Sequence, residues 1–291
     1  MSTPVDESWM AISRRNARSV QTTIGWIFWD PGALRRYEAR GLAPGLGYIA
    51  ARAAPFAGAG ADAVAAAFGS IAARAIHYVF ELLDGPGAFL EVWRDRNDAV
   101  REGLELYSPA MLPALEEFGP ALWEVVTQLP LVARPFAASH LSLERSTDPV
   151  LDAWHAVNFL REWRGDTHWA LVSAHGLSGG EASIVHNAWL GYEGDWLSLS
   201  RGNSPQEIEH AWEELALKGL ARDREVTDAG IALRQSLEDQ TDQLCELAWR
   251  LLGRDESMRF ADVFEPPCVA LLARVDETAG VQYQPASRPR P

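Results

Sequence analysis

The segment at residues 154–169 concentrates side chains that can do chemistry. Within these sixteen residues it holds two histidines, two arginines, two carboxylates and three tryptophans. Histidine exchanges protons near neutral pH, a carboxylate can orient an imidazole, and arginine binds anions through a planar fork of donors. Such a set could support acid/base chemistry on a polar or anionic small molecule, with tryptophan rings as the walls of the site.

Helical spacing arranges the first part of this segment. His155 and Glu162 lie seven positions apart and therefore share one face of a helix. Asn158 lies between them on that face, and Arg161 lies beside it. The spacing thus predicts that an imidazole, a carboxylate and a guanidinium face the same ligand.

Gly165 interrupts the helical pattern, and we expect one helix to end there and a second to cover residues 167–174. The change of direction would bring Asp166 and His168 back toward the first face. The alternative is structural: Arg164 and Asp166 form a local ion pair, Asp166 caps the second helix, and the histidines are hydrogen-bonded core residues. Both interpretations stay open on spacing alone.

The candidate site residues fall into two groups. The predicted catalytic residues are His155, Glu162, Asp166 and His168. The predicted ligand-binding residues are Arg52, Trp154, Asn158, Arg161, Trp163 and Arg164. In this scheme a histidine moves protons, a carboxylate orients the imidazole and the arginines hold negative charge, which suits an elimination, a cyclisation or an isomerisation.

Arg52 comes from outside the segment. It stands alone in a small apolar stretch at residues 48–56. Its side chain either follows that surface out to water or points into a cavity as an anchor for an anion. The stretch is compatible with both.

A metal site would need histidines from several elements. The candidate ligands are His140, His155, His168 and His186, with Glu162 or Asp166. No His-x-x-x-His or His-x-His pair supports such a site. A glycine-rich phosphate loop, a nucleophile elbow, a zincin helix and a dinucleotide-binding fingerprint are also absent from the sequence. We therefore expect neither a metal nor a cofactor.

Helices must position these residues, because apolar residues recur at helical spacing along most of the chain. In the first half the predicted helices cover residues 9–29, 32–40, 61–83, 89–105 and 109–131. In the second half they cover residues 149–164, 167–174, 179–190, 205–218 and 233–252, with a two-stranded ribbon at 220–226. The clearest start signals are Thr147 or Asp148 before Pro149, and the capping box from Ser204 to Glu207.

The segment at residues 140–149 is rich in Ser, Thr and Asp, which is typical of a connection between domains. The sequence therefore predicts a mainly α fold of two helical domains with winged-helix-like character and a small β-ribbon. The predicted parts are a disordered tail at 1–8, an N-terminal helical domain at 9–140, a C-terminal winged-helix-like domain at 147–275 and a disordered tail at 276–291.

Composition limits the partners. The net charge of the 291 residues is −14, and of 26 basic residues only Lys218 is a lysine. This balance disfavours binding to nucleic acid, because contacts to phosphate need a basic surface. Cys245 and Cys268 lack metal-ligand spacing, which predicts two buried free thiols in a reducing compartment. With no signal peptide and no membrane span in the pattern, we expect a cytoplasmic protein that does not bind a membrane.

The motifs of the second half resemble those of a known family. They are LREWRGDTH at 160–168, WEEL at 212–215 and VTDAG at 226–230. They are similar to the actinobacterial SalK-like proteins, which are labelled MarR-like helix-turn-helix proteins, across roughly residues 20–275. That family commonly has histidine at the position of Trp163 and glycine at the position of Thr167. The resemblance implies a winged helix-turn-helix, whose long helices commonly form a homodimer or bind a partner subunit.

The predicted recognition helix of such a module, at residues 205–218, is acidic. Its charged residues are Glu207, Glu209, Glu213 and Glu214 against Lys218. These carboxylates would repel DNA. The first hypothesis is therefore a cofactor-independent acid/base enzyme of bacterial specialised metabolism that acts on a small molecule. The alternatives are a ligand-binding sensor or resistance protein, and a MarR-like DNA-binding regulator.

Overall fold

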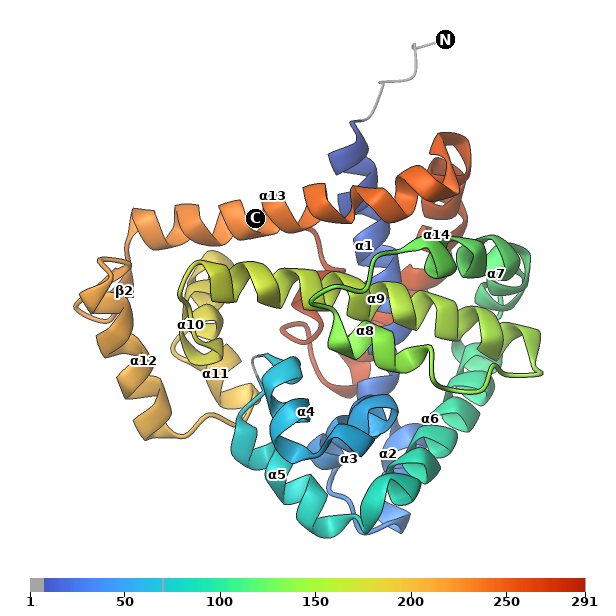
Figure 1. The fold of residues 1–291 in the computed structure, drawn as a ribbon, viewed down its shortest axis with the longest axis horizontal. Coiled ribbons are helices and arrows are strands. Elements are labelled where there is room, and N and C mark those ends of the chain that lie inside the picture. Colours follow the sequence, from blue (N-terminus) through green and yellow to red (C-terminus); the bar gives the residue numbers. More distant parts are fainter. Residues whose placement is uncertain (1–7, 70, 291) are drawn as a thin grey trace.

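Helices make up almost all of the fold. The computed structural model describes residues 8–69 and 71–290, and within them the only sheet is a ribbon of two short strands (Figure 1). The predicted mainly α fold with a small β-ribbon is therefore confirmed. Over the same ranges no helix has the length and apolar character needed to cross a membrane. The predicted disordered tail at 1–8 lies outside the described residues, except for Ser8, which caps the first helix.

The first half of the chain forms helices of unequal length. They are α1 (Trp9–Gly25), α2 (Pro31–Ala39), α3 (Pro44–Ala53), α4 (Ala61–Phe68), α5 (Ala73–Leu82), α6 (Gly85–Tyr107), α7 (Met111–Gln128) and α8 (Pro135–His140). Two short 3-10 turns, η1 (Trp26–Trp29) and η2 (Ala54–Ala59), follow α1 and α3. The single helix predicted at 61–83 is divided, because Gly69 adopts a φ of 73° and ends α4.

The second half begins with the longest helix. Its elements are α9 (Pro149–Ala174), α10 (Gly179–Trp189), α11 (Trp196–Ser200), α12 (Pro205–Leu217), α13 (Asp228–Leu252), α14 (Arg254–Thr278) and η3 (Pro285–Ser287). Asp148 caps α9, and Ser178 and Ser204 form capping boxes at α10 and α12. A side-chain cap contributes about 1 kcal/mol to helix stability, which explains why local sequence located these starts well.

The helix α9 is continuous, which corrects the predicted break at Gly165 and the separate helix predicted at 167–174. Gly165 keeps a helical backbone, whereas many other glycines of the chain have a positive φ. A glycine costs a helix about 1 kcal/mol relative to alanine. Burial of Trp163 and Val172 on either side outweighs this cost. Asp166 and His168 therefore follow helical spacing and do not turn back on the first part of the segment.

The C-terminal segment, for which the sequence predicts a disordered tail at 276–291, packs against the rest of the protein over residues 276–290. The ring of Tyr283 packs against that of Trp29 with centroids 4.4 Å apart. Arg290 forms an ion pair with Asp242, which is fully buried on α13. Both side chains therefore find partners on elements that are far away in the sequence.

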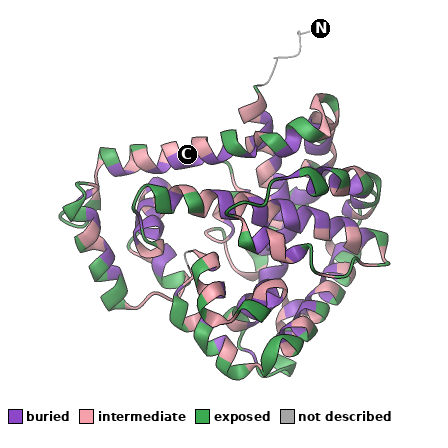
Figure 2. Cartoon of the chain, viewed as in Figure 1, coloured by how far each residue is buried: buried purple, intermediate pink, exposed green. Residues whose placement is uncertain are grey.

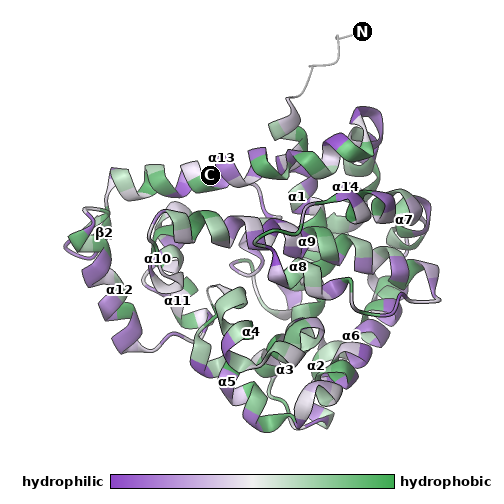
Figure 3. Ribbon diagram, viewed as in Figure 1, coloured by the Kyte–Doolittle hydropathy of each residue, from purple (hydrophilic) through white to green (hydrophobic). Residues whose placement is uncertain are grey.

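Two hydrophobic cores lie along α9 and α13. The larger one gathers α1, α3, α6, α7 and α14 around residues such as Phe159 of α9 and Trp249 of α13. The smaller one gathers α10, α12 and the ribbon around Val172 of α9 and Leu237 of α13. The two helices pack against each other and run from one core to the other (Figure 1). Buried and hydrophobic residues line the faces where the helices meet (Figures 2 and 3).

The division of the cores does not coincide with the predicted connection at 140–149. Helix α7, which precedes that connection, packs extensively against α9, which follows it. The larger core therefore draws on both sides of the connection.

The ribbon consists of β1 (Ala221–Arg222) and β2 (Glu225–Val226), which pair antiparallel with Ala221 opposite Val226. The two residues between them, Asp223 and Arg224, have φ angles of 52° and 62°, as a tight turn of a hairpin requires. The ribbon lies between α12 and α13, at the left of Figure 1. Two helices, a ribbon and a long helix follow one another as in a winged helix-turn-helix.

Candidate ligand-binding site

A cavity of about 440 Å³ lies where α9 and α13 pass between the two cores. Residues of α1, α3, α4, α5, α10, α11, the turn η1 and the C-terminal segment also line it. Among the described residues, the arginines that line it are Arg52, Arg161, Arg164, Arg201, Arg234 and Arg290. In the same ranges the lining carboxylates are Glu162 and Glu238. The lining therefore carries more positive than negative charge.

Helix α9 supplies one wall of this cavity by regular spacing. Arg161, Gly165, His168 and Val172 line it at intervals of three or four residues. A Cβ atom built on Gly165 would meet nothing closer than a carboxylate oxygen of Glu162 at 3.8 Å. The glycine that suggested a break in the helix instead leaves open space in the middle of the wall.

Glu162 is held in place by two arginines. Its carboxylate accepts hydrogen bonds from Nη2 and Nε of Arg52 at 2.8 and 3.1 Å, and it also pairs with Arg161. Burial alone would raise the pKa of Glu162, but these two guanidinium groups outweigh it and lower the pKa to about 2. Arg52 thus points into the cavity rather than to the surface, and Glu162 already occupies its donors.

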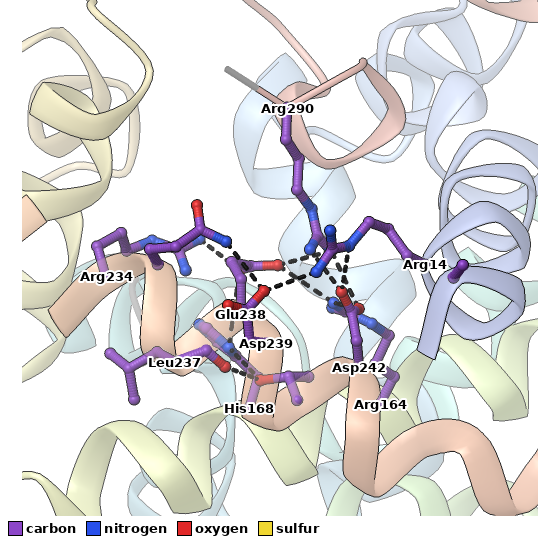
Figure 4. Close-up of polar contacts among 12 residues, drawn as sticks. Arg14, Arg164, His168, Arg234, Leu237, Glu238, Asp239, Asp242 and Arg290 are labelled. Atoms are coloured by element: carbon purple, nitrogen blue, oxygen red, sulfur yellow. Dashed lines mark hydrogen bonds and ion pairs between the residues drawn. The ribbon is translucent and has the colours of Figure 1, made fainter. Parts of the chain in front are cut away.

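A second group of charges joins α9, α13 and the C-terminal segment (Figure 4). Glu238 and Asp242 lie one turn apart on α13. Arg164 contacts them at 3.2 and 2.9 Å, and Arg290 contacts them at 2.8 and 2.6 Å. Arg14 of α1 also donates to Asp242 at 2.9 Å. These ion pairs hold the end of the chain against the cavity.

His168 stands at the cavity wall as a neutral group. Thr241 Oγ1 donates to the backbone oxygen of Leu237 at 2.6 Å, and it therefore accepts from His168 Nδ1 at 3.1 Å. Burial lowers the pKa of His168 to about 3, although the carboxylate of Glu238 acts in the opposite direction. At neutral pH this histidine is uncharged.

Several cavity residues had no place in the sequence prediction. Arg201 follows α11, Arg234 belongs to α13 and Arg290 to the last residues, while His186 of α10 was considered only as a metal ligand. These residues lie on separate elements, so no spacing rule could group them. Among the three arginines, only Arg234 resembles Arg52 in the sequence, because it is a single arginine that follows the apolar residues 229–233.

His155, a predicted catalytic residue, does not line the cavity. Its ring packs against the rings of Trp93 and Trp154, with centroids 5.3 and 5.9 Å away. Burial, followed by the charge of Arg96, lowers the pKa of His155 to about 3. Seven helical residues separate it from Glu162 by about 10 Å along the axis, and the cavity reaches α9 only from Arg161 onward.

Asp166 and Asn158 also lie away from the cavity. Asp166 accepts a hydrogen bond from the backbone N–H of Ala137 at 2.9 Å, in the first turn of α8, and it does not pair with Arg164 as the structural alternative expected. Asn158 Nδ2 lies 3.2 Å from His140 Nε2 in the larger core. Through these contacts both residues join α8 to α9.

The tryptophans of the segment divide in the same way. Trp154 Nε1 donates to the backbone oxygen of Thr23, and Trp163 Nε1 to that of Pro130, each at 2.8 Å. Both rings are buried in the larger core. Trp169, by contrast, lines the cavity. Of the predicted site residues, those that line the cavity are Arg52, Arg161, Glu162, Arg164 and His168.

Metal-binding chemistry has no support in the geometry. Across residues 8–69 and 71–290, no three His, Cys, Asp or Glu side chains are grouped as a metal site requires. The alternative metal site built from His140, His155, His168 and His186 is therefore not formed. Cys245 and Cys268 are buried free thiols, as predicted.

The titratable groups at the cavity each keep one protonation state near neutral pH. Glu162 stays ionised because its pKa is about 2, and His168 stays neutral because its pKa is about 3. Burial also lowers the pKa of His186 well below its ordinary value. A general acid or base works best with a pKa near the working pH. The arrangement therefore favours recognition of a charged ligand over proton transfer.

Comparison with known proteins identifies the family to which the chain belongs. The profile of a Helix-turn-helix family matches residues 13–278, from α1 to the end of α14. Searches of curated proteins and of solved structures return no match. The profile match spans both cores, the cavity between them and the ribbon. The chain therefore belongs to this helix-turn-helix family.

Proposed function

We propose that this protein is a small-molecule-binding member of its helix-turn-helix family. The observation that carries the proposal is the cavity of about 440 Å³ between the two cores, lined by arginines and aromatic rings. Pockets for small ligands have volumes of roughly 300 to 1,000 Å³ and combine apolar walls with a few polar groups. A ligand there would contact α9 and α13, which connect the two cores. Binding would therefore affect the packing of the smaller core, which includes the ribbon.

Acid/base catalysis, the first hypothesis from the sequence, receives less support than binding. Of its four catalytic candidates, His155 and Asp166 lie outside the cavity wall. The other two, Glu162 and His168, have pKa values of about 2 and about 3, far from neutral pH. Each would transfer protons inefficiently at pH 7.

DNA binding as a MarR-like regulator is the second candidate function, and the family match favours it. The exposed face of α12, the helix in the recognition position, argues against it because Glu209 and Glu213 lie there. Lys218 is paired with Glu181, and the wing residue Arg224 with Glu209. A gel-shift assay at low salt with DNA from upstream of its own gene decides the matter, since specific retardation would assign this second role.

A pair of fluorescent probes tests the proposed function. Anilinonaphthalene sulfonate is an aromatic anion, and phenylnaphthylamine is its neutral counterpart. We expect saturable binding of at least one probe with a single site. Gly165→Leu puts a side chain into the cavity and should weaken that binding by about tenfold or more, because the leucine would occupy the space that the aromatic rings of the probe need. Gly87→Leu, at the exposed start of α6, is the matched control and should leave it unchanged.

Two outcomes would contradict the proposal. Either the probe fluorescence rises without saturation, as for weak adsorption to the surface, or Gly165→Leu binds the probes as tightly as the natural protein does. Far-ultraviolet circular dichroism of each variant verifies that α9 and its neighbours are folded before binding is compared.

A further inference from the structure

Arg201 is a cation at the cavity wall that forms no ion pair in the part of the chain that the structure describes. It lines the cavity just after α11, and its Nη1 donates to Ser183 Oγ at 3.1 Å. Among the described residues no carboxylate forms an ion pair with it, in contrast to Arg52 and Arg164 in the same wall. Burial, together with the nearby charges of Arg234 and Arg52, lowers the pKa of Arg201 to about 10 although Tyr48 acts the other way.

Arg234 presents a second set of free donors close by. Its side chain is about 95% buried and pairs with Glu238, yet its Nη1 has no hydrogen-bond partner within the described ranges. The guanidinium lies over the ring of Trp189, 5.1 Å from its centroid. Since Glu238 is shared with Arg164 and Arg290, it does not neutralise Arg234 alone.

His186 adds to the same side of the cavity. Burial, then the charges of Arg234 and Arg201, lowers its pKa, so the imidazole is neutral. It lines the cavity together with both arginines, and no carboxylate among the described residues forms an ion pair with it. A neutral imidazole can donate a hydrogen bond to an anion without adding a charge to be buried.

Buried guanidinium groups with free donors destabilise the protein unless an anion binds to them. A buried charge without a partner costs several kcal/mol, and arginine forks match the two oxygens of a carboxylate, sulfonate or phosphate. The neighbouring wall is aromatic: the Tyr283 ring contacts those of Trp29 and Trp196, with centroids 4.4 and 5.0 Å away. All three residues line the same cavity.

We propose that Arg201 and Arg234 form the binding seat for the anionic group of an aromatic ligand, whose ring system lies against the wall of Trp29, Trp196 and Tyr283. This inference rests on the proposed function and specifies it. The ligand class is an aromatic carboxylate, sulfonate or phosphate. Arg52 and Arg164, which are already paired with carboxylates, shape the cavity and do not hold the anion.

The test compares dissociation constants of the two probes for the natural protein, Arg201→Gln and Arg234→Gln. We expect anilinonaphthalene sulfonate to bind about tenfold or more tightly than phenylnaphthylamine, because each charge-assisted hydrogen bond strengthens binding by roughly that factor. Arg201→Gln should remove this preference and leave the affinity for the neutral probe unchanged. The matched control is Arg35→Gln, an exposed arginine of α2 outside the cavity.

Arg201→Lys covers the case in which Arg234→Gln does not fold. It keeps the charge but loses the fork, so it should retain part of the preference for the anion. Equal affinity for the two probes, or an equal loss of both in Arg201→Gln, would overturn the anion seat while leaving the proposed function intact. If neither probe binds in a way that Gly165→Leu prevents, the proposed function itself fails.

Discussion

Asp166 and Glu162 are buried carboxylates one turn apart on α9, and their surroundings shift their pKa values in opposite directions. Burial raises the pKa of Asp166 to about 6, because the backbone N–H of Ala137 only partly offsets the loss of water. For Glu162 the guanidinium groups of Arg52 and Arg161 outweigh burial and bring the pKa to about 2. The presence of a direct ion pair decides the sign.

The stability of Asp166→Asn should depend on pH. In the natural protein the folded-state pKa of Asp166 exceeds the ordinary value of 3.8. The folded state therefore binds more protons than the unfolded state between about pH 4 and pH 6, and ionised Asp166 destabilises the fold above that window. Asparagine still accepts from Ala137 without a charge. We expect it to raise the free energy of unfolding by roughly 1 to 2 kcal/mol at pH 7.5 and by nearly nothing at pH 4.

Urea unfolding at the two pH values measures this difference. Asp98→Asn, at an exposed position on α6, serves as the control and should show no such dependence. An identical effect of Asp166→Asn at both pH values would mean that the carboxyl of Asp166 is not perturbed by burial.

At the scale of the element, Gly165 separates what local sequence can and cannot predict. Helix starts at Asp148, Ser178 and Ser204 were predictable, because a cap is a contact within four residues of the chain. The continuity of α9 was not predictable from local sequence. The free-energy cost of Gly165 in a helix is a local property, whereas the burial that outweighs it comes from the two cores that the helix joins. The expectation that Asp166 and His168 turn back toward the first face of the helix failed for the same reason.

Gly165→Ala should stabilise the protein. Position 165 has an ordinary helical backbone, and the added Cβ would lie 3.8 Å from its nearest neighbour, a normal contact. Because alanine also restricts the unfolded chain, we expect the free energy of unfolding to increase by about 0.5 to 1 kcal/mol. Thermal and urea unfolding measure it. A loss of stability would indicate that the helix does bend at this residue.

At the scale of the whole molecule, the site depends on parts of the chain that are far apart in sequence. The candidates on α9 that do line the cavity, such as Arg161 and His168, were found because one helix carries them. Arg201, Arg234 and Arg290 belong to other elements, and only the folded chain brings them to the same wall. Spacing within one helix indicated residues that lie on one wall of the cavity and could not indicate those on the other walls.

The C-terminal segment should determine how long a ligand stays bound. It carries Tyr283 into the aromatic wall and pairs Arg290 with α13. Removal of residues 281–291 leaves α14 intact, because this helix ends at Thr278. We expect probe dissociation in stopped-flow experiments to be about tenfold faster, since one side of the cavity would open to water.

Arg290→Gln separates the two contributions of this segment. It removes the ion pairs to Glu238 and Asp242 but keeps Tyr283, so it should accelerate dissociation less than the deletion does. If the deletion leaves the dissociation rate unchanged, the segment does not form part of the binding wall.

The sharing of α9 and α13 between the cores also governs how the molecule unfolds. Val172 and Leu237 anchor these helices in the smaller core, while Phe159 and Trp249 anchor them in the larger one. Neither core can lose its packing while both helices keep theirs, which couples the two into one cooperative unit. Hydrogen exchange should therefore be slowest in the central turns of α9, where the cores meet, and the ribbon should open only as a local fraying of that unit.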